Sequence, residues 1–195
     1  MKKHILIFTV ILTFSVFYSF NASAQGMEVG KNNLGIGIGA GHNYYGTLTG
    51  FTPAGRINFD HGFFEAGPGV ITIGGSVGVS SHSYKYTYRS YTKKYRWTNF
   101  VIATRGAWHY NFGQIGPEKL NAYGGIGLGL RIESYSYSYD GSYTYDPYYN
   151  ESDGGVFPHF ATFVGGSYQA TDNVGFFAEF GYDITNALIG VNFRF

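Results

Sequence analysis

Apolar and polar side chains alternate with a period of two residues over most of this chain. The clearest run covers 187–195 and places five apolar side chains on one face: Ala187, Ile189, Val191, Phe193 and Phe195. A two-residue period is typical of a β-strand that has one face in apolar surroundings. Glycine, 30 of 195 residues, also disfavours helices, because it is costly in helix interiors.

Seven further segments alternate in the same way, at 34–41, 56–63, 71–80, 99–112, 125–133, 156–168 and 174–182. Eight strands predict an all-β protein. The aromatic content of 20% and the net charge of +1 exclude a disordered chain, and the absence of cysteine excludes a disulfide scaffold. The nearly neutral charge also argues against a nucleic-acid partner.

The first 24 residues predict a cleaved signal peptide. Lys2 and Lys3 form a basic start, 5–20 is mainly apolar, and Ala22 and Ala24 fit the small-residue cleavage pattern. We therefore expect an exported chain in which 25–195 forms a single domain.

Charged residues occupy the middle of several strands, opposite the apolar face. A soluble sandwich or lipocalin-like barrel would turn its apolar face inward and these charges outward. Here, however, the polar face is mostly Gly, Ser and Asn, unlike a Lys/Glu-rich soluble surface. Trp108, Tyr110 and Phe112 also gather at one strand end, as in an interfacial girdle. The apolar face is therefore expected to meet lipid.

The connections between strands differ in length. The expected short ones are 66–69, 112–120, 172–173 and 183–186, and the long ones are 43–53, 83–97 and 139–155. With both termini in the periplasm, all the long connections are extracellular. This pattern predicts an eight-stranded antiparallel up-and-down transmembrane β-barrel, closed so that every backbone group is paired.

The C-terminal segment and several strands resemble a known family. Gly190, Phe193 and Phe195 are similar to the C-terminal signal that the barrel assembly machinery recognises, although Leu188 stands where a polar residue is usual. The segments 34–41, 123–130 and 172–182 resemble the small outer-membrane β-barrel proteins of Gram-negative bacteria, the porin-family or OmpA/OmpX-like barrels. The resemblance implies a location in the outer membrane, with the assembly machinery and periplasmic chaperones as partners.

An eight-stranded barrel is just wide enough for side chains to fill. The predicted lumen charge network consists of Arg56, Asp60, Arg105, His109, Arg131, Glu133, Glu179 and Arg194. Charges in such a space must be paired, so these side chains are expected to form a neutralising plug. The alternative is a narrow path for ions.

The long connections carry Tyr in alternation, which suggests hairpins that extend above the membrane. The predicted surface residues are Tyr84, Lys85, Tyr86, Tyr88, Arg89, Lys93, Lys94, Tyr135, Tyr137 and Tyr139. The second long connection is basic and the third, with Asp140, Asp146, Glu151 and Asp153, is acidic. These connections either pair with one another or bind lipopolysaccharide phosphates or an extracellular partner.

Motifs for catalysis, cofactors or metals are not found in the sequence. His82 lies near Ser80, Ser81 and Ser83, but its strand carries no carboxylate that would complete a triad. We therefore expect a monomer with a structural or surface-interaction role and no enzymatic activity. The alternatives are a small transport barrel for ions or apolar molecules and, less favoured, a lipid-modifying enzyme.

Overall fold

The computed structural model describes residues 26–41, 53–88, 91–112, 119–141 and 152–195, so the predicted signal peptide lies outside the described residues. It has eight strands: β1 (Asn32–Ala40), β2 (Pro53–Ala66), β3 (Gly69–Tyr88), β4 (Tyr91–Asn111), β5 (Leu120–Gly141), β6 (Ser152–Gln169), β7 (Val174–Tyr182) and β8 (Ala187–Arg194). Each strand is antiparallel to its neighbours, and β1 pairs with β8 to close the barrel. The predicted eight-stranded up-and-down barrel is confirmed. Among the described residues, no helix is long and apolar enough to cross a membrane.

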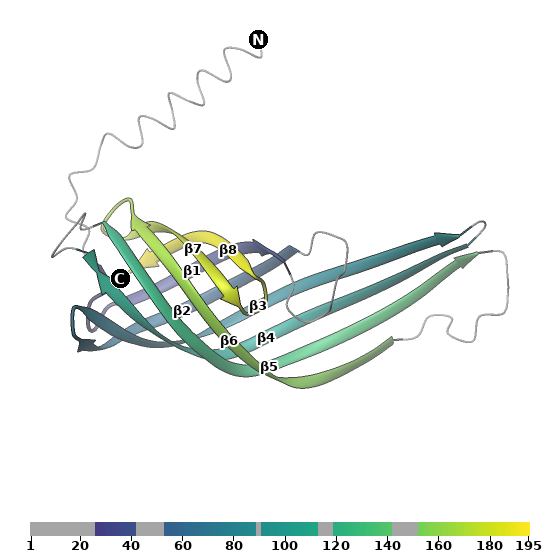
Figure 1. The fold of residues 1–195 in the computed structure, drawn as a ribbon, viewed down its shortest axis with the longest axis horizontal. Helices are drawn as coiled ribbons and strands as arrows, with labels where there is room; N and C mark the ends of the chain where they lie inside the picture. Colours follow the sequence, from purple (N-terminus) through teal and green to yellow (C-terminus); the bar gives the residue numbers. More distant parts are fainter. Residues whose placement is uncertain (1–25, 42–52, 89–90, 113–118, 142–151) are drawn as a thin grey trace, which may run out of the picture.

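The two ends of the described chain meet at one end of the barrel, which we call the terminal end. The backbone N–H of Asn32 donates to the carbonyl of Phe195 at 2.8 Å, and the N–H of Phe195 donates back at 3.0 Å. At the opposite end, β3, β4, β5 and β6 continue well beyond the other four strands (Figure 1).

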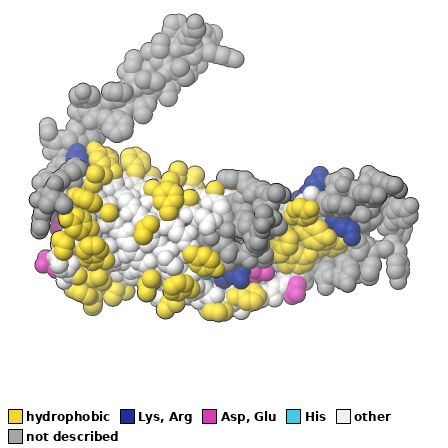
Figure 2. All heavy atoms as spheres, viewed as in Figure 1, with side chains coloured by type: hydrophobic (Ala, Val, Ile, Leu, Met, Phe, Trp, Pro, Cys, Tyr) yellow, Lys and Arg dark blue, Asp and Glu magenta, His cyan; other side chains and the backbone are white. Residues whose placement is uncertain are grey.

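Outward-facing side chains form an apolar belt around the barrel. They include Ile36, Ile38, Ile57, Phe59, Ile73, Val77, Phe100, Ile102, Leu128, Leu130, Phe160, Val164, Phe176, Phe180 and Ile189, all exposed. Figure 2 shows such side chains spread over the barrel, with few charges among them. A soluble monomer does not expose a continuous apolar surface of this extent. The belt is therefore a lipid-facing surface.

The belt ends sharply on the long strands. Val79, Phe100, Ile132 and Val156 pair side by side in one row, and the next outward row holds Ser81, Thr98 and Ser134. Near the terminal end, Trp108 and Tyr110 face outward with their rings 5.8 Å apart. The ten-residue distance from Phe100 to Tyr110 corresponds to about 26 Å of height for tilted strands, which matches an apolar band of roughly 25 Å.

Beyond that row, β3 to β6 form a four-stranded sheet that we call the wall. It comprises β3 from Ser81, β4 up to Thr98, β5 from Glu133 and β6 up to Gly155. The expected long connection at 83–97 is a hairpin that extends above the belt, as the alternating Tyr suggested, and β3 and β4 stay paired up to Tyr88 and Tyr91. Cross-strand aromatic pairs stabilise such an extension.

The wall has two lateral edges, because β2 ends near the belt boundary and β7 ends within the belt. In the described chain, β2 pairs with β3 only as far as Ser80, and β7 pairs with β6 only from Thr162. Exposed edges invite pairing with other chains, and Lys or Pro on an edge prevents it. Lys85 lies on the β3 edge of the wall, and Pro158 lies on the unpaired stretch of β6 just below the wall.

Candidate functional site

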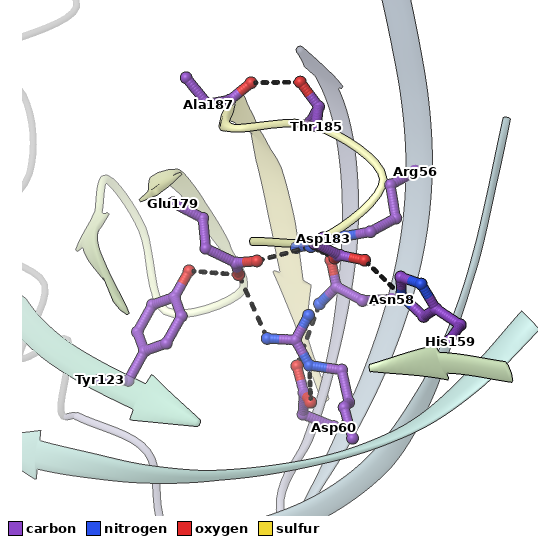
Figure 3. A network of polar contacts seen from close by, with 10 residues as sticks. Arg56, Asn58, Asp60, Tyr123, His159, Glu179, Asp183, Thr185 and Ala187 are labelled. Atoms are coloured by element: carbon purple, nitrogen blue, oxygen red, sulfur yellow. Dashed lines mark hydrogen bonds and ion pairs between the residues drawn. The ribbon is translucent and has the colours of Figure 1, made fainter. Parts of the chain in front are cut away.

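A buried cluster of ion pairs fills the middle of the lumen (Figure 3). Arg56 Nη1 lies 2.5 Å from Glu179 Oε1 and 2.6 Å from Asp183 Oδ2. Arg105 pairs with the same glutamate, Nη2 to Oε2 at 3.2 Å, and with Asp60, Nε to Oδ1 at 2.9 Å. Glu179, on β7, thus pairs with two arginines that come from β2 and β4. Buried charges persist only when they are paired in this way.

Neutral side chains complete the cluster. The Tyr123 hydroxyl donates to Glu179 Oε2 at 3.3 Å, and Asn58 Nδ2 donates to Asp60 Oδ2 at 3.0 Å. The Arg105 guanidinium also lies 4.1 Å above the ring of Phe163. These contacts provide the additional hydrogen bonds and stacking that a buried ion cluster requires.

The eight residues of the predicted charge network all face the lumen, but at three levels. Arg56, Asp60, Arg105 and Glu179 form the central cluster. Nearer the wall, Arg131 pairs with Glu133 at 2.6 Å and lies over the Phe157 ring at 4.8 Å. Nearer the terminal end, His109 Nδ1 accepts from Asn121 at 2.9 Å, and Arg194 donates to the carbonyl of Gly26 at 3.0 Å.

Sequence reasoning missed two members of the central cluster. Asp183 shares the polar face of Glu179 by alternation but begins the expected 183–186 connection and was left out of the network, yet it is buried and accepts from Arg56. His159 Nε2 lies 2.9 Å from the other Asp183 oxygen. The signal was present, because Asp183 continues the inward alternation of Glu179 and Gly181 along β7. With it, four acids face four arginines: Asp60, Glu133, Glu179 and Asp183 face Arg56, Arg105, Arg131 and Arg194.

Apolar side chains lie inside the lumen near both ends of the described barrel. The β7–β8 connection folds inward, so Ile184, only 1% exposed, packs against Val101 and Ala103. Thr185 Oγ1 holds this connection by donating to the carbonyl of Ala40 at 2.6 Å. At the terminal end Met27, also 1% exposed, borders a cavity of about 10 Å³, room for at most one water molecule.

The wall has two faces of different chemistry. Its outer face, which continues the belt, carries Lys85 directly opposite Lys94, with Arg96 one row nearer the lipid. All three side chains are exposed, and among the described residues no carboxylate pairs with them. The remaining described side chains of this face are mainly Ser and Thr.

The inner face of the wall, which continues the lumen, is aromatic. One cross-strand row contains Tyr84, Tyr95 and Tyr137, with ring centroids 6.2 and 5.1 Å apart. The next row contains His82, Trp97 and Tyr135, with centroids 6.0 and 5.4 Å apart. An open groove of about 660 Å³ lies along these rows, bordered also by Phe157, Glu133 and Asp153.

The residues predicted on surface loops therefore lie mostly on strands. Tyr84, Lys85, Lys93, Lys94, Tyr135 and Tyr137 belong to the wall, as do the backbones of Tyr86, Tyr88 and Tyr139, whereas Arg89 lies outside the described residues. The two long connections do pair as strands, 91–93 with 139–141, but among the described side chains no ion pair joins Lys85 or Lys94 to Asp153. Asp153 lies on the inner face, while Lys85 and Lys94 lie on the outer face. Asp140 and the acids of 142–151 are not described at the side-chain level.

The residues of the predicted assembly signal lie on and directly after β8. Phe193 and Phe195 are exposed near the terminal end, while Gly190 faces inward against the ring of Phe177. Their recognition by the assembly machinery stays a prediction.

Two similar solved structures are of Ail, the attachment invasion locus protein of Yersinia pestis, and one of them is in complex with the heparin analogue sucrose octasulfate. Their TM-scores are 0.55 for the complex and 0.51; each is 13% identical, over 86% of this chain and 100% of Ail. The N-terminal β-barrel domain of Pseudomonas aeruginosa OprF is 16% identical over 88% of this chain and 100% of that domain, with a TM-score of 0.39. No protein-family model and no curated protein matches. The fold is that of the small outer-membrane β-barrels, as predicted.

Proposed function

We propose that this chain is a monomeric outer-membrane barrel with a closed lumen and a non-enzymatic surface role, in which the wall binds anionic groups. The observation that carries the proposal is that Lys85 and Lys94 lie directly opposite each other on neighbouring strands, on the outer face of the wall. Like charges directly opposite each other destabilise a sheet. An anion that bridges them removes this repulsion.

The position of the basic residues supports a ligand at the membrane surface. Arg96 lies four residues and Lys94 six residues beyond Phe100, the last belt residue of β4. At about 3.4 Å per residue this is roughly 14 to 20 Å along the strand. Phosphate groups of lipopolysaccharide and sulfate groups of extracellular glycans share the required chemistry. The complex of Ail with a sulfated sugar supports the same ligand class for this fold.

The test is a binding titration of the refolded barrel in detergent micelles. Sucrose octasulfate represents the glycan source, and phosphorylated and dephosphorylated lipopolysaccharide represent the lipid source. Lys85→Ser/Lys94→Ser should weaken binding roughly fivefold per lysine and reduce its dependence on salt. The control, Lys31→Ser/Lys119→Ser, removes the same charge from the terminal end. Equal weakening by both double variants would show non-specific attraction and contradict the proposal.

A further inference from the structure

The groove on the inner face of the wall combines aromatic rings with carboxylates. Tyr84, Tyr95, Trp97, Tyr135 and Phe157 border it, together with Glu133 and Asp153. A groove lined only by rings would accept any apolar group. The two acids add a preference for positive charge, and the faces of aromatic rings attract cations as well.

Two basic side chains of the protein make cation–π contacts with aromatic rings, one at each end of the inner face of the wall. The Arg131 guanidinium lies 4.8 Å from the centroid of Phe157, and Lys93 Nζ lies 5.9 Å from the centroid of Tyr137. These contacts indicate that the inner face stabilises positive charge. Tyr95, Trp97 and Tyr135 lie between the two ends and form the floor of the groove.

The two carboxylates differ in their partners. Glu133 is neutralised by Arg131 at 2.6 Å. Asp153 is exposed, and its Oδ1 accepts from the backbone N–H of Gly154 at 2.7 Å. Within the described part of the chain, no basic side chain forms an ion pair with Asp153. The groove therefore retains one carboxylate charge beside its aromatic floor.

Gly155 keeps the groove open. A Cβ at this position would lie 2.8 Å from the ring of Phe157, which leans over the glycine. Any larger residue on this inward position of β6 would displace the ring or fill the space beside Glu133, its partner on β5.

From this geometry we infer that the groove binds a quaternary ammonium group, of the kind carried by choline. Such a cation is weakly hydrated and is recognised by aromatic rings together with a nearby carboxylate. The primary ammonium of a lysine is strongly hydrated, so it loses more hydration free energy than a quaternary ammonium when it enters an aromatic site. This site lies on the opposite face of the wall from the basic residues of the proposed function and takes ligands of opposite charge.

The fluorescence of Trp97 reports binding directly. The chain has two tryptophans, so Trp108→Phe leaves Trp97 as the sole reporter in every protein compared. The barrel is kept in a polyoxyethylene detergent, which carries neither a cation nor a sugar. The probes are choline, its uncharged isostere dimethylbutanol, lysine amide and methyl glucoside. We expect saturable quenching by choline, with an affinity at least about fivefold above that of the other three probes.

Three substitutions locate the site. Asp153→Asn, Tyr135→Leu and Gly155→Leu should each weaken choline binding at least about fivefold, while Lys85→Ser/Lys94→Ser should leave it unchanged. Asp153 is exposed, so its variant keeps the test valid if the groove variants fail to fold. Equal binding of dimethylbutanol would show a merely apolar groove, and tighter binding of methyl glucoside a sugar site. Equal binding of lysine amide, or no saturable quenching, would also overturn the inference.

Discussion

Glu179 is the residue on which the centre of the lumen depends most. It accepts from Arg56, Arg105 and Tyr123, which lie on three different strands. Its removal would leave the two arginines with Asp183 and Asp60 alone, in surroundings that water hardly reaches. An ion cluster of this kind determines which side chains pack together inside the barrel. Without its partners, each charged group would be buried unpaired at a high cost in free energy.

Glu179→Ala should therefore lower the urea midpoint of unfolding markedly. Breaking a buried ion pair costs about 3–5 kcal/mol, since the remaining charge stays buried. Glu65→Ala is the control, because Glu65 is exposed near the β2–β3 turn and should change the midpoint little. Matched denaturant titrations in one detergent give the comparison. Equal midpoints for both variants would mean that the lumen charges are solvated, as in a water-filled pore.

Adjacent glycines of β5 provide a second test at the residue scale. A Cβ on the inward Gly125 would lie 2.2 Å from the carbonyl oxygen of Gly106 and 2.7 Å from the ring of Phe163, whereas one on the outward Gly124 meets nothing closer than 3.6 Å. Gly125→Ala should destabilise the barrel by about 1–3 kcal/mol through this overlap. Gly124→Ala should be neutral or slightly stabilising. The same urea titrations decide, and equal effects would contradict the inward assignment of Gly125.

Strand alternation predicted which side chains face the lumen, and the structure places all eight charged candidates there. It could not predict which of them touch, because contact depends on strand register and on the height of each residue in the barrel. Arg131 and Arg194 therefore face the lumen without joining the central cluster. Asp183 was left out of the network because it begins a short connection between strands, and such connections are normally exposed.

At the scale of elements, the strands of the barrel differ widely in length. β1, β7 and β8 have eight or nine residues, whereas β3, β4 and β5 have 20 to 22. The sequence predicted the short strands well, since apolar alternation continues over their whole length. Along the wall Tyr alternates with Ser and Lys, which is typical of loops as well as of strands. The Tyr alternation suggested extended hairpins, and the cross-strand aromatic rows show how far the ladder continues.

The packing of the β7–β8 connection inside the lumen, on which the proposed closure depends, is testable. Ile184→Ala should cost about 2–5 kcal/mol of unfolding free energy, because it leaves a cavity against Val101 and Ala103. Ile189→Ala is the matched control, since Ile189 faces lipid with 60% of its surface exposed. Ile189→Ala should lower the free energy of unfolding by only roughly half a kcal/mol. If the two variants unfold at the same urea concentration, Ile184 does not pack inside the barrel.

On the scale of the whole molecule, one continuous sheet presents three kinds of surface. The belt is apolar and faces lipid, the outer face of the wall is basic, and the inner face is aromatic with acids. The belt and the outer face of the wall lie on the same side of the sheet. The change from apolar to polar side chains beyond the row of Val79 and Phe100 therefore marks the level of the lipid surface. The two proposed ligand classes therefore approach the wall from opposite sides.

The same arrangement predicts that the barrel does not conduct ions. Met27, the ion cluster around Glu179 and Ile184 obstruct the lumen in series, and opening any one of them leaves the other two in place. Planar-bilayer recordings of the purified barrel should therefore show no unitary current steps, and Ile184→Ala should remain equally silent. A general porin inserted into the same bilayer shows that steps are detectable. Reproducible steps from the parent barrel would mean that the lumen opens in lipid, and the transport alternative would then replace the closed barrel. Steps from Ile184→Ala alone would instead identify the β7–β8 connection as the sole obstruction, which the buried ion pairs of Arg56 and Arg105 argue against.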